Sequence, residues 1–427
     1  MTNTSDLNAA NEPAFHEKSD KNSGRHLITF VIVTAFLNIM SMTISSPVTP
    51  FMVQKYVVDP HNLALVTGAL FSCYSVCQFF AAPMLGALSD RYGRRWLLLI
   101  CLLGSAIGYV MYGLGGALWI FFLSRIIDGL TGGNISILFA LMADITKPEE
   151  RGKLFGLLGA VSGIGLIVGP ALGGFVARLG YQVPFYMAAA LMLVNMLWCY
   201  FFVPETLSKE RRSTQTALAD LSPFKRLGDL FLLPQLRWLL LAGVFYSVPF
   251  MVFRSTITLL TKDNLGWHPE NIGLILLVVG SMDILVQGVL IGRLLPIFGE
   301  VRLVVGGFVC QIIGYLLISV VAFEASPIIL FTGVTIYALG GGLIEPSLGA
   351  LSSRAAGSEH QGAFLGGSQS LQSLVYILAP LWAGFLYVQF GHATPYWSNV
   401  VVVGLAIVFV LMAMSSLKAR SSQIEAG

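Results

Sequence analysis

The amino-acid sequence predicts an all-α membrane protein, in which twelve transmembrane helices form two pseudo-symmetric six-helix bundles. Three observations support this fold class: the composition, the number of long apolar segments and an internal repeat. Of the 427 residues, 56% are hydrophobic and only 11% are charged, whereas about a quarter of an ordinary soluble domain is charged. With a mean hydropathy of +0.77, the chain has too few charges to cover a water-exposed surface, so lipid must surround most of it.

Twelve apolar segments are long enough to cross the hydrocarbon core of a bilayer as helices. In chain order they span residues 27–53, 63–89, 96–114, 118–143, 153–177, 182–203, 236–260, 271–292, 303–323, 327–351, 363–388 and 396–416. The polar segment 1–26 that precedes them lacks the features of a secretory signal. We expect this segment to be a disordered cytoplasmic N-terminus, and residues 418–427 to be a cytoplasmic tail.

A polar and basic connection over residues 204–235 follows the sixth apolar segment. We interpret it as a cytoplasmic linker between an N-terminal bundle, residues 27–203, and a C-terminal bundle, residues 236–417. The first bundle repeats in the second at an offset of 210 residues: RGKLFGLLGAVSGIGLIVGPALGGF (151–175) aligns with QGAFLGGSQSLQSLVYILAPLWAGF (361–385). Paired repeats of spanning helices are typical of secondary transporters, whose substrate site lies between the halves near the bilayer midplane.

The basic residues predict the orientation, because Lys and Arg gather in the cytoplasmic connections of membrane proteins. If both termini are cytoplasmic, all but five of the 25 Lys and Arg residues fall on the cytoplasmic side. Lys55, Arg178 and Lys262 fall on the opposite side, and Arg125 and Arg254 lie within helices. We therefore place both termini in the cytoplasm, and the net charge of +3 does not indicate nucleic-acid binding.

The sequence contains no pattern for an enzyme or for a cofactor. The five cysteines lie within predicted helices without the spacing of a metal site. A nucleotide-binding loop of the form G-x-x-x-x-G-K-[ST] is absent, and so is a catalytic triad. We expect neither a bound metal nor a cofactor. We also expect that transport is not powered directly by ATP. The expected partners are a small-molecule substrate, protons and the lipid bilayer, and we expect a monomer.

Five charged residues fall inside the predicted transmembrane helices, where charges are costly and mark substrate or proton pathways. They are Arg125, Asp128, Arg254, Asp283 and Glu345. Arg125 and Asp128 share a helix face because they are three residues apart. They either neutralise each other as a structural pair, or form a switch in which protonation of Asp128 frees Arg125 for the substrate.

Glu345, Asp283 and Asp128 are the candidates for proton coupling, in that order. Glu345 comes first because GGGLIEPSLG surrounds it with three glycines and a proline, as expected where a helix breaks at a binding site. Asp283 has no oppositely charged neighbour in the local sequence, so it could exchange a proton near neutral pH. As an alternative, Arg254 pairs with one of these acids across the bundle and both have only a structural role.

Polar and aromatic side chains are candidates for the wall of the substrate cavity. The polar candidates are Asn38, Arg125, Arg254 and Gln311, followed by Gln78, Gln287 and Gln372. Aromatic residues in the helices could add apolar surface, although such residues more often pack in the core or face lipid. The aromatic candidates are Phe71, Tyr74, Phe245, Tyr246, Phe250, Phe253, Tyr337 and Tyr376.

Four motifs resemble those of the major facilitator superfamily, and more narrowly those of the twelve-helix drug:proton antiporters of the tetracycline-efflux type. The resemblance covers essentially the whole chain. The motifs are SSPVTP (45–50), GALSDRYGRRWLL (86–98), RIIDGLTGG (125–133) and GLLGAVSGIGLIVGPALGG (156–174). The second motif marks the superfamily, and the fourth accompanies export rather than uptake within it.

The resemblance implies a secondary active transporter of the bacterial inner membrane. It would export a small amphipathic compound, such as a drug, a metabolite or a siderophore, in exchange for protons by alternating access. Uptake by proton symport or facilitated diffusion on the same fold is one alternative. A sensor that has lost transport is another. Tetracycline exporters carry an acid in helix one where this chain has Asn38, and their acids in helices three and nine are not matched here, so their proton-carrying set is not transferred.

Within the motif at residues 86–98, SDRYGRR (89–95) is predicted to form a tight turn that acts as a conformational latch, built from Asp90, Arg91, Gly93 and Arg94. Gly86 and Gly93 would let two helices and the turn pack closely, and a carboxylate such as Asp90 can sit against the positive end of a helix. The resemblance places that partner at the start of helix eleven. As an alternative, Asp90 is a turn residue with a role only in folding.

The motif at residues 156–174 is predicted to form the hinge of an antiporter. Its glycines recur at spacings of three and four residues and form a smooth face for a partner helix. Pro170 permits a bend. The hinge residues are Gly165, Gly169, Pro170, Gly173 and Gly174. Tight packing without a role in transport is the alternative.

Overall fold

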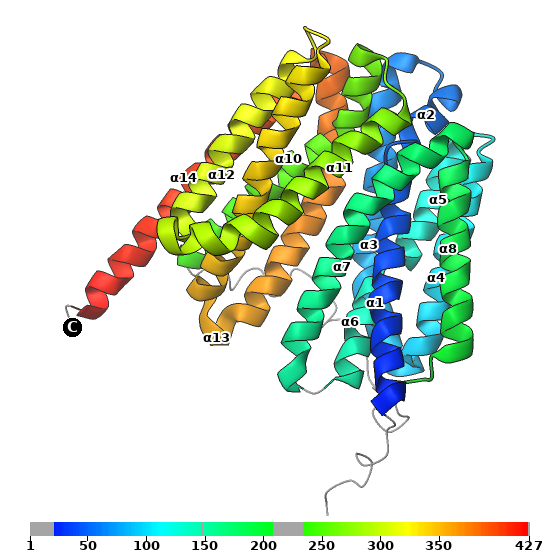
Figure 1. Cartoon of the computed structure of the whole chain (residues 1–427), viewed down its shortest axis with the longest axis horizontal. Coiled ribbons are helices and arrows are strands. Elements are labelled where there is room, and N and C mark those ends of the chain that lie inside the picture. The colour runs from blue at the N-terminus through cyan, green and yellow to red at the C-terminus, as the bar shows by residue number, and fades with distance from the viewer. Residues whose placement is uncertain (1–20, 147, 208–233, 426–427) are drawn as a thin grey trace, which may run out of the picture.

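The computed structural model describes residues 21–146, 148–207 and 234–425, and all regular elements within these ranges are helices (Figure 1). Most of the predicted disordered segment at 1–26 and of the predicted linker at 204–235 lies outside them. Helix α1 begins at Lys21, so the last residues of the predicted disordered segment belong to the first helix. Helix α14 continues to Glu425, well into the predicted tail.

The N-terminal bundle contains eight helices because two of its six membrane crossings are each broken in two. In chain order they are α1 (Lys21–Ile44), α2 (Thr49–Val53), α3 (Leu63–Tyr92), α4 (Arg94–Leu114), α5 (Leu118–Thr131), α6 (Asn134–Ile145), α7 (Pro148–Val176) and α8 (Val183–Phe202). Two 3₁₀ turns follow α2, at Gln54–Tyr56 and Pro60–Asn62, and one follows α7, at Ala177–Leu179.

The C-terminal bundle has fewer and longer helices. They are α10 (Pro234–Leu265), α11 (Pro269–Leu285), the π-helical turn η6 (Val286–Leu290), α12 (Ile291–Val320), α13 (Pro327–Phe390) and α14 (Thr394–Glu425). Within the described residues, eleven helices are long and apolar enough to cross a membrane. One of them, Pro269–Val320, has 52 residues and contains two of the predicted crossings.

Two predicted crossings of the N-terminal half are interrupted at two of the motifs, SSPVTP (45–50) and RIIDGLTGG (125–133). The segment 27–53 breaks at residues 45–48, where Pro47 has no N–H to continue the helix. The segment 118–143 breaks at Gly132 and Gly133, which separate α5 from α6. Glycines disfavour a helix, and here they make room, because a Cβ atom on Gly132 would lie 2.8 Å from the Tyr74 hydroxyl.

Three predicted connections are shorter than expected or helical. In place of the predicted tight turn, Gly93 alone separates α3 from α4, and its φ of 104° favours glycine. Asp90 and Arg91 still belong to α3. The predicted loop 293–302 is helical and bends at Gly299, whose φ is 73°. The predicted loop 352–362 belongs to α13, whose two halves fold back on each other as two crossings (Figure 1).

Each half of the chain has its own apolar core. The main core of the N-terminal half centres on stacked and edge-on rings, with Tyr112 4.4 Å from Phe185 and 4.7 Å from Phe121 between ring centroids. The larger core of the C-terminal half includes the ring pair Phe253 and Tyr337, 4.4 Å apart. Apolar side chains also cover the outside, where Phe80, Trp96, Phe201, Phe202, Phe323 and Leu378 are more than half exposed. A surface of this kind is suited to lipid rather than to water.

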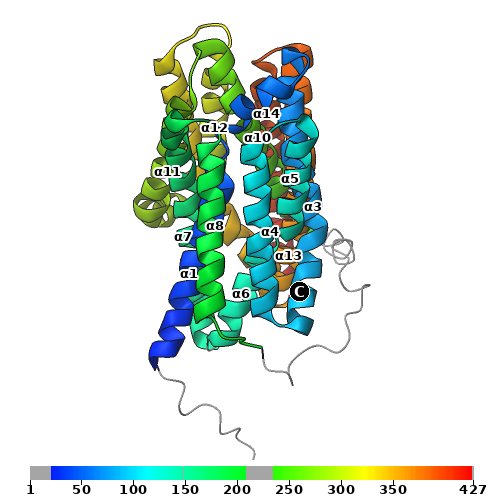
Figure 2. The same ribbon diagram turned by 90° about the vertical axis from the view of Figure 1, so that its right-hand side faces the viewer.

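The two bundles converge at the end away from the termini and diverge toward the end where the termini lie (Figure 1). Figure 2 looks onto the N-terminal bundle, whose long helices run along the same axis as those behind them. At the converging end, Gly68 of α3 abuts the Pro380 carbonyl of α13, and Gly174 of α7 abuts the Pro269 carbonyl of α11. An ion pair of 3.8 Å between Arg178 and Glu270 also joins the halves there.

The diverging end lacks this close packing along α7. Gly152, Gly156, Gly159 and Gly163 occupy its terminus-side portion, and a Cβ atom added to any of them would meet no atom within 4 Å. The same holds for Gly86 of α3, so the predicted close packing at Gly86 is wrong for this conformation. The structure is therefore closed at one end and open at the end that carries the termini.

Candidate functional site

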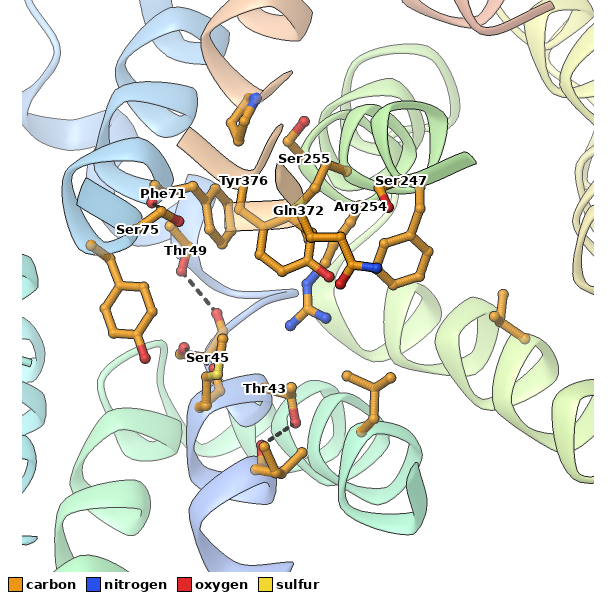
Figure 3. A pocket seen from close by; sticks show the side chains of 18 of the residues that line it. Thr43, Ser45, Thr49, Phe71, Ser75, Ser247, Arg254, Ser255, Gln372 and Tyr376 are labelled. Atoms are coloured by element: carbon orange, nitrogen blue, oxygen red, sulfur yellow. Dashed lines mark hydrogen bonds between the residues drawn. The ribbon is translucent and has the colours of Figure 1, made fainter. Parts of the chain in front are cut away.

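A cavity of about 410 Å³ lies between the two bundles and is lined by both (Figure 3). The N-terminal half contributes residues of α1, α3, α4, α5 and α7 and of the break at 45–49. The C-terminal half contributes residues of α10, α11 and both crossings of α13. The cavity is thus located where an internal repeat of spanning helices places a transported substrate.

Six of the ten charged or polar residues predicted for proton coupling or for the cavity wall line this cavity: Gln78, Arg125, Arg254, Asp283, Glu345 and Gln372. Asp128, Asn38, Gln311 and Gln287 do not line it. Asp128 is 3% exposed and Gln311 2% exposed. The side-chain nitrogen of Asn38 is buried and has no hydrogen-bond partner among the described residues.

Arg125 is held by its surroundings in the N-terminal bundle. Its Nη1 lies 3.3 Å from Oδ2 of Asp128, and both side chains are largely buried. The guanidinium also lies over the rings of Tyr112, Tyr109 and Tyr74, at 4.8, 5.6 and 6.0 Å from their centroids. Arginine is stabilised by such rings as well as by a carboxylate. The pair that both alternatives require is therefore present in this conformation.

Arg254 has a different environment in the C-terminal bundle. It is on α10, and its guanidinium points into the cavity beside Tyr376 and Gln372, toward Ser45 (Figure 3). No ion pair joins it to any other residue that the structure describes. The alternative in which Arg254 pairs with Asp283 or Glu345 across the bundle is therefore not realised in this conformation.

Asp283 of α11 and Glu345 of α13 face the same cavity from neighbouring helices. Neither forms an ion pair within the described part of the chain. Gln287 lies beside Glu345. A Cβ atom added to Gly341 would lie 3.9 Å from Oδ1 of Asp283 and 3.8 Å from the side-chain nitrogen of Gln311, so Gly341 leaves space between these two side chains.

A π-helical turn follows Asp283 almost directly. The turn η6 spans Val286–Leu290 and contains Gln287. Such turns are rare, and they occur frequently at functional sites. Nothing in the local sequence indicates it, because the apolar pattern of the segment is equally compatible with an unbroken α-helix.

Aromatic residues form much of the apolar wall. Of the eight aromatic candidates, six line the cavity: Phe71, Tyr74, Tyr246, Phe250, Tyr337 and Tyr376. Three of these six, Tyr246, Tyr337 and Tyr376, also pack against buried core residues, whereas Phe245 and Phe253 pack in the core without lining the cavity. Hydroxyl residues that are not among the sequence candidates also line the wall, among them Thr43, Ser45, Thr49, Ser247 and Ser255 (Figure 3). The SSPVTP motif could have indicated two of them, because the helix breaks there.

The predicted latch lies at the open end, away from the cavity. Arg94 is buried and pairs both with Asp90, at 2.9 Å, and with Asp144 of α6. Its backbone N–H donates to Glu205 at 2.9 Å. The Asp90 side chain is 52% exposed, and Arg91 lies over the ring of Tyr92. The predicted partner of Asp90 lies at the start of the eleventh predicted crossing, residues 363–388, which is the second crossing of α13. Most side chains there lie outside the described residues, so this partner stays a prediction.

The predicted hinge residues lie on two faces of α7. Gly165, Gly169 and Gly173 face α1, where added Cβ atoms would strike the backbone of residues 36–44. The Thr43 hydroxyl donates to the Gly165 carbonyl at 3.2 Å. Pro170 and Gly174 face α11 of the other half, and the Pro170 carbonyl would lie 3.0 Å from a Cβ atom on Gly273. Helix α7 therefore joins the packing within one bundle to the packing between both.

Comparison with known proteins identifies relatives along the whole chain. The family described as Major Facilitator Superfamily matches residues 31–366 and again 239–426. The chain is 31% identical to the Tetracycline resistance protein, class C, of Escherichia coli, over 90% of this chain and 94% of that one. Among solved structures, the human organic anion transporter MFSD10 (TETRAN) matches with a TM-score of 0.67 and 25% identity, covering 91% of this chain and 99% of that chain. A bacterial homologue of the lysosomal transporter Spinster, in an inward-facing and unoccupied conformation, shares the fold with a TM-score of 0.72 at 14% identity, covering 93% and 98%.

Proposed function

Because this chain belongs to the major facilitator superfamily of membrane transporters, we propose that it is a proton-coupled antiporter that exports a small amphipathic compound. The observation that carries the proposal is the cavity between the halves, which combines aromatic walls with three charged groups that lack an ion-pair partner among the described residues. Charges are costly at membrane depth, and those retained there mark substrate or proton pathways. The similarity to a tetracycline resistance protein supports export.

The distribution of basic residues supports an orientation with both termini in the cytoplasm. In that orientation the open end faces the cytoplasm, and the conformation described here admits a substrate from inside the cell. The chain would then be a multi-pass protein of the bacterial inner membrane. We expect it to work as a monomer, since each chain contains both halves of the cavity.

Alternating access requires the packed end to open while the open end closes. The contacts that must separate are those at Gly68 and Gly174 and the ion pair between Arg178 and Glu270. At the other end, the exposed carboxylate of Asp90 is available to engage the opposite bundle as the two approach. Contacts that exist in one state only are what allow a ligand or a proton to shift the equilibrium between states.

Glu345 and Asp283 are the proposed proton carriers, in that order. Both face the cavity, whereas Asp128 is engaged by Arg125 and is nearly inaccessible. A proton that crosses the membrane releases about 2.3 kcal/mol per 100 mV. An acid can couple this energy to export if protons reach it from one side of the membrane in one state and from the opposite side in the other state. Asp128 is the last candidate for this role.

Transport into proteoliposomes tests the proposal. The purified full chain is reconstituted, a pH gradient is imposed, and accumulation of a panel of amphipathic compounds is measured with and without an ionophore that collapses the gradient. We expect at least one compound to move against the direction of proton flow and to lose its accumulation with the gradient. Movement in the same direction as protons would instead establish symport, and gradient-independent equilibration would establish a facilitator.

A further inference from the structure

We infer that the cavity is built for a zwitterionic substrate, whose anionic group binds Arg254 and whose cationic group competes with protons for Asp283 and Glu345. An apolar ring body between the two groups would lie against the aromatic wall. This inference rests on the proposed export function and names the chemical class of its substrate.

The first step is the missing counter-ion of Arg254. A charged group out of water is costly unless it is paired and hydrogen-bonded. Arg125 is paired with Asp128 and packs against three tyrosine rings, although its Nε and Nη2 have no hydrogen-bond partner among the described residues. Arg254 has no ion-pair partner among the described residues, and its guanidinium points into the cavity (Figure 3). An anionic group of the substrate would supply the partner, because the planar guanidinium binds carboxylates through two parallel hydrogen bonds.

The second step is the position of the acids. Asp283 and Glu345 line the same cavity, but no nitrogen of Arg254 lies within 4.0 Å of either carboxylate. The cavity therefore keeps opposite charges apart instead of letting them neutralise each other. A ligand with an anion at one end and a cation at the other fits this separation better than one that carries a single charge.

The third step concerns the direction of coupling. Binding of an anion alone would be favoured when the nearby acids are protonated, so the anion and the proton would bind together. By linkage this arrangement favours co-transport of anion and proton. A cationic group at Asp283 and Glu345 has the opposite effect, because it is attracted by the ionised acids and displaces their protons. Exchange of substrate for protons therefore requires the cationic group as well.

The fourth step is the apolar body of the substrate. Phe71 and Tyr376 lie beside each other near Arg254 (Figure 3), and Tyr74 and Phe250 extend the wall. Aromatic rings pack favourably against flat ring systems and attract an ammonium group to their faces. A cavity of about 410 Å³ is within the range that holds a drug-sized ligand.

A matched set of four compounds tests the inference. The parent is a biphenyl with an aminomethyl group on one ring and a carboxylate at the far end of the other. In its analogues the carboxylate is replaced by a carboxamide, the amine is acetylated, or both changes are made. Calorimetry on the purified full chain measures each affinity. We expect the zwitterion to bind at least tenfold more tightly than either singly charged analogue.

Variants assign each end of the zwitterion to its residues. Arg254→Gln should remove the preference for carboxylate over carboxamide and keep the preference for the free amine, and Arg254→Lys should restore part of the loss. Asp283→Asn combined with Glu345→Gln should remove the preference for the amine alone. Arg354→Gln is the charge-matched control, because Arg354 is 77% exposed and pairs with Glu300 at 3.1 Å, so all four affinities should be unchanged.

The inference is overturned if the wild-type chain binds the carboxamide or the acetylated analogue as tightly as the zwitterion, or if it binds none of the four compounds. It is also overturned if Arg254→Gln folds and leaves the preference for carboxylate unchanged. Should that variant not fold, the comparison of the four compounds on the wild-type chain still decides. Gradient-driven transport is measured separately, so a chain that prefers zwitterions but does not exchange them for protons would disprove the proposed antiport and not the substrate class.

Discussion

The two halves of this transporter share a repeat of helices but treat their membrane-embedded charges differently. In the N-terminal half, Arg125 lies 3.3 Å from Asp128 and beneath tyrosine rings. In the C-terminal half, Arg254, Asp283 and Glu345 face the cavity without ion pairs to other described residues. Paired charges add to the scaffold, and unpaired charges remain available to ligands. The symmetry of the fold therefore does not extend to its chemistry.

We therefore expect the two halves to have different roles in transport. The N-terminal half would hold its shape while the C-terminal half binds protons and the polar ends of the substrate. Helix α7 connects the two, since it packs with Gly165 against α1 and with Gly174 against α11. Variants that pair, unpair or separate these charged groups test whether the two halves have these different roles.

Glu345→Gln is expected to have the largest effect on transport. The amide cannot exchange a proton, so gradient-driven accumulation should fall to the level of protein-free liposomes, while exchange of labelled for unlabelled substrate continues. Asp283→Asn should produce the same separation to a smaller extent. Accumulation and exchange are measured in the same proteoliposomes.

Asp128→Asn provides the matched control in the N-terminal half. Because Asp128 is buried beside Arg125, its neutralisation should leave the pH dependence of transport unchanged even if the amount of folded protein falls. If Glu345→Gln and Asp283→Asn both keep gradient-driven accumulation and Asp128→Asn loses it, the assignment of tasks to the halves is reversed.

Gly169→Leu is expected to block the transport cycle with little loss of substrate binding. A side chain at Gly169 would strike the Thr43 hydroxyl and the Met40 carbonyl of α1, so α7 and α1 could no longer pack as closely as they do. Transport should drop at least tenfold. Gly404→Leu in α14 is the control, since a Cβ atom there meets nothing within 4 Å, and it should transport normally. Equal transport by both variants would remove α7 from the mechanism.

The sequence predicts the fold well because its apolar segments and their internal repeat record the crossings directly. It does not predict the helix breaks that shape the site. The break at Gly132 and Gly133 depends on the approach of Tyr74 from another helix, and the π-helical turn after Asp283 has no local signal. Continuous helix through residues 352–362 was also missed, because polar residues between two apolar segments resemble a loop.

The candidate site could be predicted for its charges but only in part for its walls. Arg254, Asp283 and Glu345 are conspicuous because few charges occur in apolar segments. Which charges are paired depends on distances between helices, and the sequence alone left that question open for Arg254. The aromatic residues are candidates for the wall, but a helical stripe of rings does not reveal whether it faces lipid, core or cavity.

The pair of Arg125 and Asp128 can be tested by thermal unfolding of three variants. Removing one partner of a buried ion pair leaves an uncompensated charge and costs about 3–5 kcal/mol. Arg125→Gln and Asp128→Asn should therefore each lower the apparent Tm, and the double variant should recover much of the loss. The corresponding change Arg254→Gln should not lower the Tm, since Arg254 loses no described ion-pair partner. Additive losses in the double variant would contradict the structural pair.

Asp90→Asn is expected to have the smallest effect, and it asks whether contact between the halves at the open end depends on charge. Asp90 and Asp144 both pair with Arg94, but the Asp90 side chain is 52% exposed and that of Asp144 24%. An exposed ion pair contributes less than about 1 kcal/mol, so Asp90→Asn should insert and unfold like the wild type. Its transport rate should nevertheless fall several-fold, because the state in which the end that carries the termini is closed would lose a contact. Asp144→Asn should show the opposite pattern, with a lower Tm and a nearly unchanged rate per folded molecule, since Asp144 acts within one bundle. Export by Asp90→Asn at the wild-type rate would make Asp90 a residue of the connection between α3 and α4 and nothing more, and would leave the two halves joined at that end by packing alone.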